Sequence, residues 1–468
     1  MRPRLLLAAF LALAAAPRAA QADLPEHLRP VVRIDPSIEA AADVSNIIFL
    51  NRCVGGCTIM GSNSISDART NTSSIPQGGP GIYQLGEWAH GDTAWDALVA
   101  CVRDVYAPYD VEVTDVDPGE AVIHHEAIVA GVGADIGWNA GGVGNVSGDC
   151  QPYDNGISFV FANQTPDVEY LCYAVAQETA HTYGLDHAYL CSDPMTYLGG
   201  CGRKYFRNLT TPCGEFSERP CRCGNVQNSH VRLNDVFGPS PVAQPVPTVS
   251  LADPTDGATV GAQFAAIATA QSTRGVSTVE LWVNGYRWVT EVDDEFENQG
   301  GTYTLRPPAE LPDGVLDLEV RAYNDLGTGY GSVTATVTKG APCTSAAACA
   351  VGQQCEEGRC FWEPATGELG DACGFDQACI SGRCEDDGAG GQACTQACIT
   401  GTANACPSPF ACVAPAGATA GLCLVAADDP GCCGAADDPG ARTGRLLLTA
   451  GVLGLLVLRP RRRTRVRR

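Results

Sequence analysis

Short apolar runs and segments with helical spacing alternate through the first part of the chain. Residues 46–51 form an apolar run suited to a buried strand, and residues 93–106 place apolar side chains at the three- and four-residue intervals of a helix. Further strand candidates are residues 109–116, 120–129 and 157–162. This order of strand, helix, strands and helix predicts an α/β or α+β domain over residues 30–237.

A second helix is predicted to begin near Pro166. Thr165 offers a hydroxyl cap, Pro166 suits the first helical position, and Asp167 places negative charge in the first turn. The helix keeps an apolar side through Val175 and then meets Gly184, a residue type that ends helices because it readily adopts positive φ. The chain is then able to turn back toward the helix it has just left.

The pattern changes after a proline-rich linker at residues 238–247, where short strands are separated by turn residues. Asn284 and Gly285 lie between two alternating runs, which is a strong hairpin signal. Residues 248–340 therefore predict an all-β sandwich. This region resembles the bacterial immunoglobulin-like domains that are appended to secreted enzymes, and PTDGATV at 254–260 fits their opening turn. The resemblance implies a fold and carries no catalytic residues.

The chain has 24 cysteines, none of them between residues 224 and 342. Such dense usage is typical of an oxidising compartment and favours disulfides over metal binding, because the paired CxxC spacing of zinc ribbons is not repeated. Residues 343–425 combine twelve cysteines with few apolar residues, so disulfides must hold this region together. Two segments share a C…GRC ending and indicate at least two related modules, whose connectivity stays open.

Both ends of the chain have the composition of targeting segments. Residues 1–22 combine early arginines, an apolar core and small residues before Asp23, as in a secretory signal peptide. In residues 430–468, Cys432 and Cys433 precede a short apolar run and an arginine cluster. This layout resembles the C-terminal sorting tails of myxobacterial surface proteins, which implies processing at Cys432 or Cys433 and anchoring at the cell surface. A simple C-terminal membrane anchor is the alternative.

Between the two targeting segments the chain holds 18 basic and 51 acidic residues, a formal charge of −33. A polyanion of this kind repels nucleic acid and anionic lipid, so we expect neither as a partner of the mature domains. Membrane contact is expected only through the C-terminal tail. The charge indicates solubility and leaves the oligomeric state open.

Six residues near the end of the first domain have the types and spacing of a metal site. Gln177 and His181 lie four apart on one helical face with Glu178 beside them, and His187 follows the glycine turn. The spacing resembles H-E-x-x-H-x-x-G-x-x-H, the zinc motif of metzincin proteases. Met195 and Tyr197 follow at the distance of the metzincin methionine turn.

The resemblance spans about 200 residues and implies a secreted, surface-anchored metalloendopeptidase that acts on proteins or peptides. It implies that Gln177, His181 and His187 hold Zn²⁺ and that Glu178 is the general base for a water molecule at the metal. Gly184, Met195 and Tyr197 would shape the site. Residues 157–162 are expected to form the edge strand along which an extended substrate lies.

Gln177 departs from the motif, which has histidine at this position. A carboxamide oxygen is a weaker zinc ligand than imidazole, so three arrangements remain open. Gln177 could bind zinc through its oxygen, or His124 or His125 could replace it as a ligand. In the third arrangement the domain binds no metal, and the protein is an inactive pseudoprotease that serves as a protein-binding or adhesion module.

Overall fold

The computed structural model describes residues 25–35, 44–293, 299–387, 390–400, 405–415, 418 and 420–425. The predicted signal peptide and the predicted tail with Cys432 and Cys433 lie outside these ranges. Within the ranges, no helix is long and apolar enough to cross a membrane. The chain divides into two compact units, Met1–Ala365 and Thr366–Arg468.

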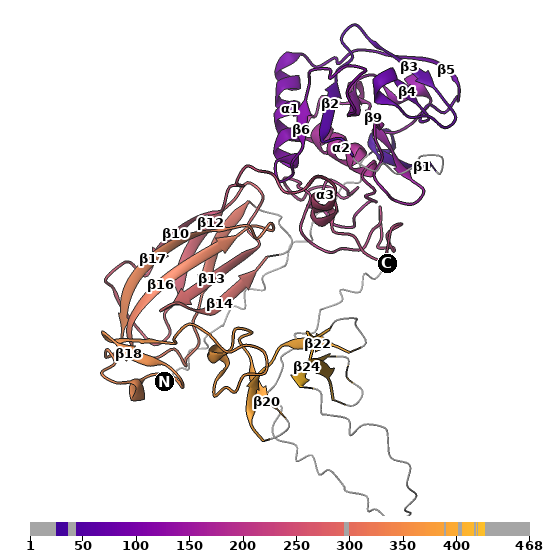
Figure 1. Cartoon of the computed structure of the whole chain (residues 1–468). Helices are drawn as coiled ribbons and strands as arrows, with labels where there is room; N and C mark the ends of the chain where they lie inside the picture. The colour runs from indigo at the N-terminus through magenta and orange to yellow at the C-terminus, as the bar shows by residue number, and fades with distance from the viewer. Residues whose placement is uncertain are drawn as a thin grey trace, which may run out of the picture. The chain divides into compact units, whose positions relative to one another are not determined.

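A six-stranded mixed sheet forms the centre of the first domain (Figure 1). In spatial order its strands are β1 (Pro30–Asp35), β8 (Gly142–Ser147), β9 (Ile157–Val160), β7 (His125–Val129), β2 (Ile47–Asn51) and β6 (Glu112–Thr114). β8 runs antiparallel to β9, and the other neighbours in the sheet are parallel. The prediction that residues 157–162 form an edge strand is wrong, because β9 is covered on its outer side by β8.

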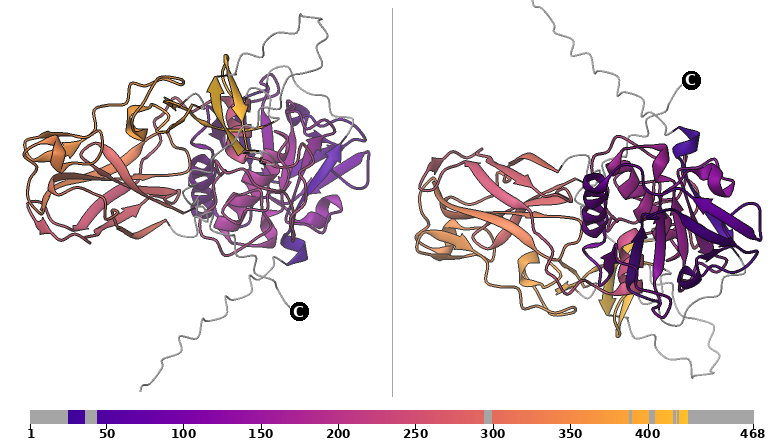
Figure 2. Two further views of the ribbon diagram at one scale, coloured as in Figure 1. Left: turned by 90° about the horizontal axis from the view of Figure 1, so that it is seen from below. Right: turned by 90° about the horizontal axis from the view of Figure 1, so that it is seen from above.

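Two helices cover one face of this sheet. α1 (Asp92–Tyr106) and α2 (Val168–His181) share a core with β2 and β7, and the Cys101–Cys172 disulfide joins them (Figures 1 and 2). The predicted cap of α2 is wrong by two residues. The side chain of Asp167 accepts hydrogen bonds from the backbone N–H groups of Glu169 and Tyr170, so the helix begins after Pro166 and not with it.

The opposite face carries a small sheet of β4 (Thr72–Ser73), β3 (Cys57–Gly61) and β5 (Gly81–Leu85). A second apolar core lies between this sheet and the alternate residues of β7, β8 and β9. Each of these strands is therefore buried on both faces. A short helix, α3 (Ser229–Phe237), closes the domain and adds Leu233 to the helical core.

The second domain is a sandwich of two sheets. One contains β10 (Thr248–Asp253), β12 (Ala266–Gln271) and β15 (Gly300–Leu305). The other contains β11 (Thr259–Val260), β17 (Tyr330–Lys339), β16 (Gly314–Tyr323), β13 (Thr278–Val283) and β14 (Tyr286–Val292). The predicted hairpin is confirmed, because Asn284 and Gly285 connect β13 to β14 and both have positive φ.

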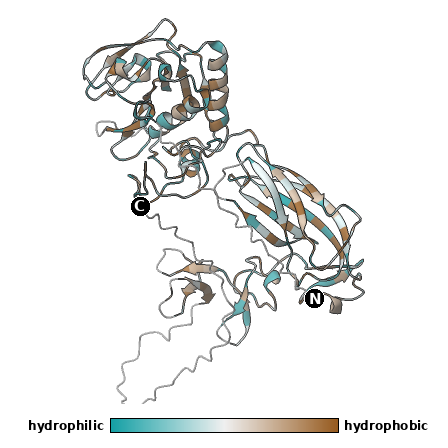
Figure 3. Ribbon diagram, turned by 180° about the vertical axis from the view of Figure 1, so that it is seen from behind, coloured by the Kyte–Doolittle hydropathy of each residue, from teal (hydrophilic) through white to brown (hydrophobic). Residues whose placement is uncertain are grey.

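Burial alternates along the sandwich strands as a two-residue period requires. Every second residue of β16 is buried, and brown and paler residues alternate along its strands in Figure 3. A buried ionic contact links this sandwich to the loop that precedes α3. Asp325 accepts hydrogen bonds from Arg274 at 2.8 Å and from the backbone N–H of Asn208 at 3.1 Å, and Arg207 lies 3.4 Å from its carboxylate.

Eleven disulfides join the 22 cysteines of residues 53–423, as the composition predicted. In the cystine-rich region, three successive groups of four cysteines pair first to third and second to fourth. The first group holds the hairpin of β18 (Gln354–Glu356) and β19 (Arg359–Phe361). The others hold β20 (Cys384–Asp386) with β21 (Gln392–Cys394), and β22 (Ala397–Ile399) with β24 (Ala420–Val425) and β23 (Phe410–Val413). The shared connectivity confirms related modules and extends them to three.

Candidate metal site

The candidate site lies where the C-terminal half of α2 packs against β8. Gln177, Glu178 and His181 are at most 2 % exposed. The residues of β8 that face α2 are glycines, and a Cβ atom added at Gly142 would lie 2.8 Å from the Glu178 carboxylate. Glycine at this position is therefore required for α2 to approach the strand with a glutamate between them.

The two predicted histidine ligands come together across the turn at Gly184. This glycine has φ +85°, and a Cβ atom there would lie 2.1 Å from the carbonyl oxygen of Cys150. The turn brings the rings of His181 and His187 to a centroid distance of 4.9 Å in an edge-to-face arrangement. The sequence motif is thus assembled into one cluster by a turn that only glycine adopts without strain.

The hydrogen bonds of the two rings determine which nitrogen atoms remain free. His181 Nδ1 lies 2.8 Å from the carbonyl oxygen of Leu185, and His187 Nδ1 lies 2.9 Å from Glu215 Oε1. Both Nε2 atoms are buried without a hydrogen-bond partner among the described residues. Burial and the neighbouring ring lower the pKa of His181 to about 3, which keeps its imidazole neutral and able to bind a metal.

Glu215 is the site residue that sequence reasoning missed. It lies in a loop 28 residues after His187 and has no motif around it. Its hydrogen bond with His187 holds the pKa of Glu215 well below its usual range, and Arg219 strengthens this effect through a 2.7 Å hydrogen bond. A carboxylate on the far nitrogen of a ligating histidine fixes the ring orientation and raises the basicity of the nitrogen that faces the metal.

Arg219 also belongs to an ionic cluster with Asp186, at 2.6 Å. Burial acts to raise the pKa of Asp186, but hydrogen bonds from Arg219, Arg222 and the backbone of His187 outweigh it and lower the pKa to about 2. Asp186, His187 and Glu215 have the spacing of a metal cluster. The guanidinium of Arg219 is bonded to both carboxylates, so this side of His187 is already neutralised.

Glu178 is a fully buried acid. Burial raises its pKa well above the usual range, and the backbone N–H groups of Gly144 and Val31 face the carboxylate and oppose this shift. Neither oxygen of Glu178 makes a hydrogen bond of normal geometry with any described residue. A carboxyl group held in this way has a high affinity for a proton, which suits a general base.

Met195 and Tyr197 belong to a turn that is bonded to the chain next to His187. Met195 is fully buried, and its backbone accepts from Ala188 at 2.7 Å and donates to Asp193 at 2.9 Å, which fixes the turn. The Tyr197 ring is 4.6 Å from the His187 ring, and its hydroxyl donates a hydrogen bond to the carbonyl oxygen of Pro30. Tyr197 therefore lies against one of the two histidines, and the Met195 backbone is bonded to the residue that follows His187.

Gln177 occupies the position where the motif has its first histidine. Its Nε2 atom is buried and has no partner in the described part of the chain. The alternative ligands have hydrogen-bond partners outside the cluster, and their replacement of Gln177 stays a prediction. Both ring nitrogens of His125 lie 3.2 Å from hydroxyls, those of Ser158 and Thr182, and His124 Nδ1 lies 2.8 Å from the carbonyl oxygen of Val122.

These donors fit a zinc ion. Two imidazoles present unpartnered Nε2 atoms, and the buried Gln177, one helical turn before His181 on α2, offers a third side chain. In the described ranges, His181 belongs to no cluster with two other histidine, cysteine or carboxylate side chains. Gln177 is thus the candidate for the third ligand.

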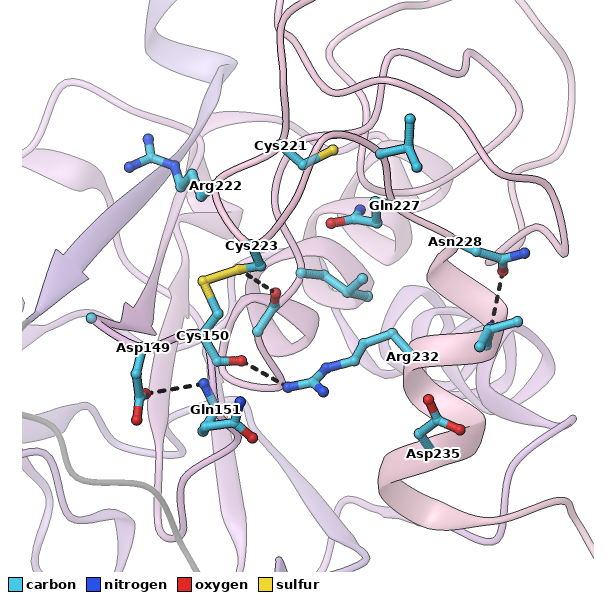
Figure 4. A pocket seen from close by; sticks show the side chains of 15 residues that line it. Asp149, Cys150, Gln151, Cys221, Arg222, Cys223, Gln227, Asn228, Arg232 and Asp235 are labelled. Atoms are coloured by element: carbon cyan, nitrogen blue, oxygen red, sulfur yellow. Dashed lines mark hydrogen bonds between the residues drawn. A yellow bond between two sulfur atoms is a disulfide. The ribbon is translucent and has the colours of Figure 1, made fainter. Parts of the chain in front are cut away.

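Two cavities lie near this cluster. One of about 270 Å³ is lined by Gln177, Pro30, Thr196 and the buried end of Lys204, so it opens beside the candidate third ligand. Another of about 440 Å³ lies beyond the helix end (Figure 4). There the Cys150–Cys223 disulfide borders Arg232, which donates to the Cys150 carbonyl oxygen at 2.7 Å. That cavity includes none of the predicted ligands.

Comparison with protein families identifies a bacterial Ig domain at residues 247–320, which agrees with the predicted sandwich. No protease family matches the chain. A search of curated proteins finds no match. The family match covers the sandwich alone and leaves the first domain unassigned.

Solved structures that are similar to the chain have low identity and low TM-scores. The fibronectin(III)-like modules of Clostridium thermocellum CbhA are 19 % identical, with 23 % of this chain and 57 % of that chain covered and a TM-score of 0.17. A Jonesia denitrificans lytic polysaccharide monooxygenase is 16 % identical over 28 % and 76 %, with a TM-score of 0.15. The endo-beta-1,4-mannanase of Thermotoga petrophila is 9 % identical over 46 % and 38 %, with a TM-score of 0.16.

Proposed function

We propose that the protein is a zinc-dependent metalloendopeptidase with a metzincin-like first domain. The observation that carries the proposal is the pair of buried, unpartnered Nε2 atoms of His181 and His187 beside an unpartnered Glu178. Leaving such groups without partners is costly unless a ligand or substrate completes them. His181, His187 and Gln177 would hold the zinc, which would supply a Lewis acid for the scissile carbonyl and a water molecule of lowered pKa.

The side chains of the site divide the remaining work. Glu178 takes a proton from water and delivers it to the leaving amine, a role that its raised pKa favours. Glu215 and the Leu185 carbonyl hold the two imidazoles in the orientation that directs Nε2 inward. Tyr197 places a hydroxyl donor beside His187, where it stabilises negative charge on the scissile carbonyl oxygen.

The substrate class follows from the sheet. An extended peptide is proposed to pair with β8 through main-chain hydrogen bonds on the side where β1 lies in this structure, which would place its carbonyl groups along the site. The proposed location is the cell surface, to which the signal peptide and the tail direct the protein. The sandwich and the cystine modules would then separate the peptidase from its anchor.

A second candidate function is a pseudoprotease that binds proteins without cleaving them. The observation that favours it is Gln177, since a neutral carboxamide weakens the metal site. The two candidates differ in one measurable respect. The peptidase requires zinc and Glu178, whereas the binding protein requires neither.

The test uses the full chain. Zinc content is measured by elemental mass spectrometry, and cleavage of casein is compared between the wild type and Glu178→Ala. We expect about one zinc per chain in both proteins and cleavage at least about 100-fold slower in the variant. Asp96→Ala, an acid on the exposed side of α1, is the matched control. Equal cleavage by the wild type and Glu178→Ala refutes the peptidase.

A further inference from the structure

β8 is not the edge of the sheet in this chain. β1 pairs with it in parallel from Pro30, opposite Gly142, to Asp35, opposite Ser147. The segment therefore lies where an extended peptide would add to the sheet by main-chain pairing. The chain fills its own peptide-acceptor edge with residues that come from its N-terminal side.

The segment is held by contacts on both sides of the strand. The carbonyl oxygen of His27 accepts from Gln164 at 2.7 Å, that of Arg29 accepts from the Gly141 N–H at 2.9 Å, and that of Leu28 accepts from the Tyr170 hydroxyl. The Arg29 guanidinium lies over the Phe216 ring at 5.0 Å. Further along, Arg33 donates to the Ser74 hydroxyl at 2.9 Å.

The centre of the segment touches the candidate site itself. The carbonyl oxygen of Pro30 accepts the hydrogen bond of Tyr197, and the N–H of Val31 faces the Glu178 carboxylate. Pro30 also forms part of the wall of the cavity beside Gln177. One peptide unit thus engages the two side chains that would handle the proton and the carbonyl oxygen of a substrate.

We infer that Leu28–Arg33 is an intramolecular inhibitor that keeps the peptide groove closed. The inference rests on the proposed function for what the groove does, but the occupancy of β8 stands on the pairing and contacts alone. A tethered segment has an effective concentration in the millimolar range, so a free peptide competes poorly with it. The apparent affinity for a substrate equals the affinity of the open groove multiplied by the fraction of molecules in which the segment has left it.

The experiment weakens the segment in the full chain without changing the site. In Val31→Asp/Arg33→Glu, one substitution places charge on a half-buried side chain and the other reverses the charge of the Ser74 contact. Ile34→Asp is the matched control, because this side chain of the same strand is 50 % exposed. Arg33→Ala is a milder second variant for use if the double variant does not fold.

Three measurements are made on each protein. Hydrogen exchange reports on residues 141–147, fluorescence anisotropy reports binding of a labelled synthetic peptide of residues 26–35, and casein cleavage reports activity. We expect the weakened variant to exchange faster at β8, to bind the peptide, and to cleave casein at least about tenfold faster than the wild type. The wild type and Ile34→Asp should bind the peptide at least tenfold more weakly.

The outcomes separate this inference from the proposed function. Peptide binding and faster exchange without any cleavage would support the closed groove and refute the peptidase. Unchanged exchange, together with equal peptide binding by all the proteins, would overturn the inhibitor. A new N-terminus at Val31, found by mass spectrometry, would also overturn it, because the segment would then be a substrate.

Discussion

The first domain and the sandwich use their buried polar groups in different ways. Twelve buried side-chain atoms of the described residues lack a hydrogen-bond partner, and only two of them, Arg274 Nη1 and Arg321 Nε, lie in the sandwich. Five belong to Gln177, Glu178, His181 and His187. The sandwich instead pairs its buried acid, since Glu280 accepts from Arg287 and from Trp282, each at 2.8 Å.

The sandwich satisfies nearly all of its own buried polar atoms, whereas the first domain does not. A buried polar atom without a partner costs about 1–3 kcal/mol, so proteins keep such atoms where a ligand or a reaction needs them. In the sandwich, apolar side chains alternate with polar ones along the strands, so the apolar side chains fill the core and the polar ones find partners. In the first domain the same chain keeps unpaired donors and acceptors together at the end of one helix.

Among the variants proposed here, His187→Ala is expected to change zinc affinity the most. Removal of one of two imidazole ligands should lower zinc affinity by more than about 100-fold, because the carboxamide cannot compensate. Competition with a chromophoric chelator measures the affinity. His90→Ala, which removes a histidine from the same domain but outside the cluster, should bind zinc like the wild type. Equal affinity in all three proteins would show that the unpaired atoms do not form a metal site.

Gln177→His tests the proposed third zinc ligand by replacing it with a stronger one. Since imidazole is the better zinc ligand, the variant should bind zinc at least about tenfold more tightly than the wild type. The same chelator competition gives the ratio. Gln84→His, on the exposed side of β5, is the control. Unchanged affinity in Gln177→His would remove Gln177 from the set of ligands.

Glu215→Gln tests whether the hydrogen bond between Glu215 and His187 Nδ1 affects metal binding at His187 Nε2. Loss of an outer partner of a ligating histidine typically weakens metal binding by about 10–100-fold, and we expect the lower part of this range because Arg219 remains nearby. Metal affinity is measured for Glu215→Gln and for Glu218→Gln, an exposed neighbour. The orienting role is refuted if both variants bind zinc as the wild type does.

Glu126 shows that an unpaired buried acid also has a consequence for stability. Burial raises its pKa from 4.5 to about 7, although Asn51 donates to Oε1 at 2.7 Å. The folded state holds the proton more tightly than the unfolded chain. The contribution of Glu126 to stability is therefore complete below pH 4.5 and is lost as pH rises through 7, by up to about 3 kcal/mol.

Glu126→Gln should consequently raise the melting temperature of the first domain at pH 8 and leave it nearly unchanged at pH 4.5. Calorimetry of the full chain at the two pH values measures this difference. The matched variant in the sandwich, Glu280→Gln, breaks a paired acid and should give no gain at pH 8. A gain of equal size at both pH values for Glu126→Gln would contradict the raised pKa.

The sequence allowed the helix, the turn and the positions of Gln177, Glu178, His181, Gly184 and His187 to be predicted because these depend on local spacing, whereas Met195 and Tyr197 were named from the resemblance to the metzincin motif. The i and i+4 positions of α2 and the glycine after it determine where Gln177, His181 and His187 lie. The hairpin at Asn284 and Gly285 follows from the same kind of local rule.

Contacts between distant segments could not be predicted in this way. β8 has the sequence GVGNVS, whose glycines weaken any strand pattern, and they are present because Glu178 needs the space. Without β8, residues 157–162 were placed at the edge of the sheet. Glu215 is brought to His187 by a loop whose path depends on tertiary packing and disulfides, so no spacing rule identifies it.

The buried carboxylate of Asp325 has a practical meaning for how this protein is divided. Its side chain is 1 % exposed, as is that of Arg207, so a cut at the linker would separate this carboxylate from the buried Arg207 of the first domain. The proline-rich linker at residues 238–247 marks the boundary between the two domains, but it is an unsuitable place to truncate the protein. The first domain and the sandwich should therefore be expressed and unfolded as a single cooperative piece, and a transplanted first domain would need Arg207 replaced by an uncharged residue.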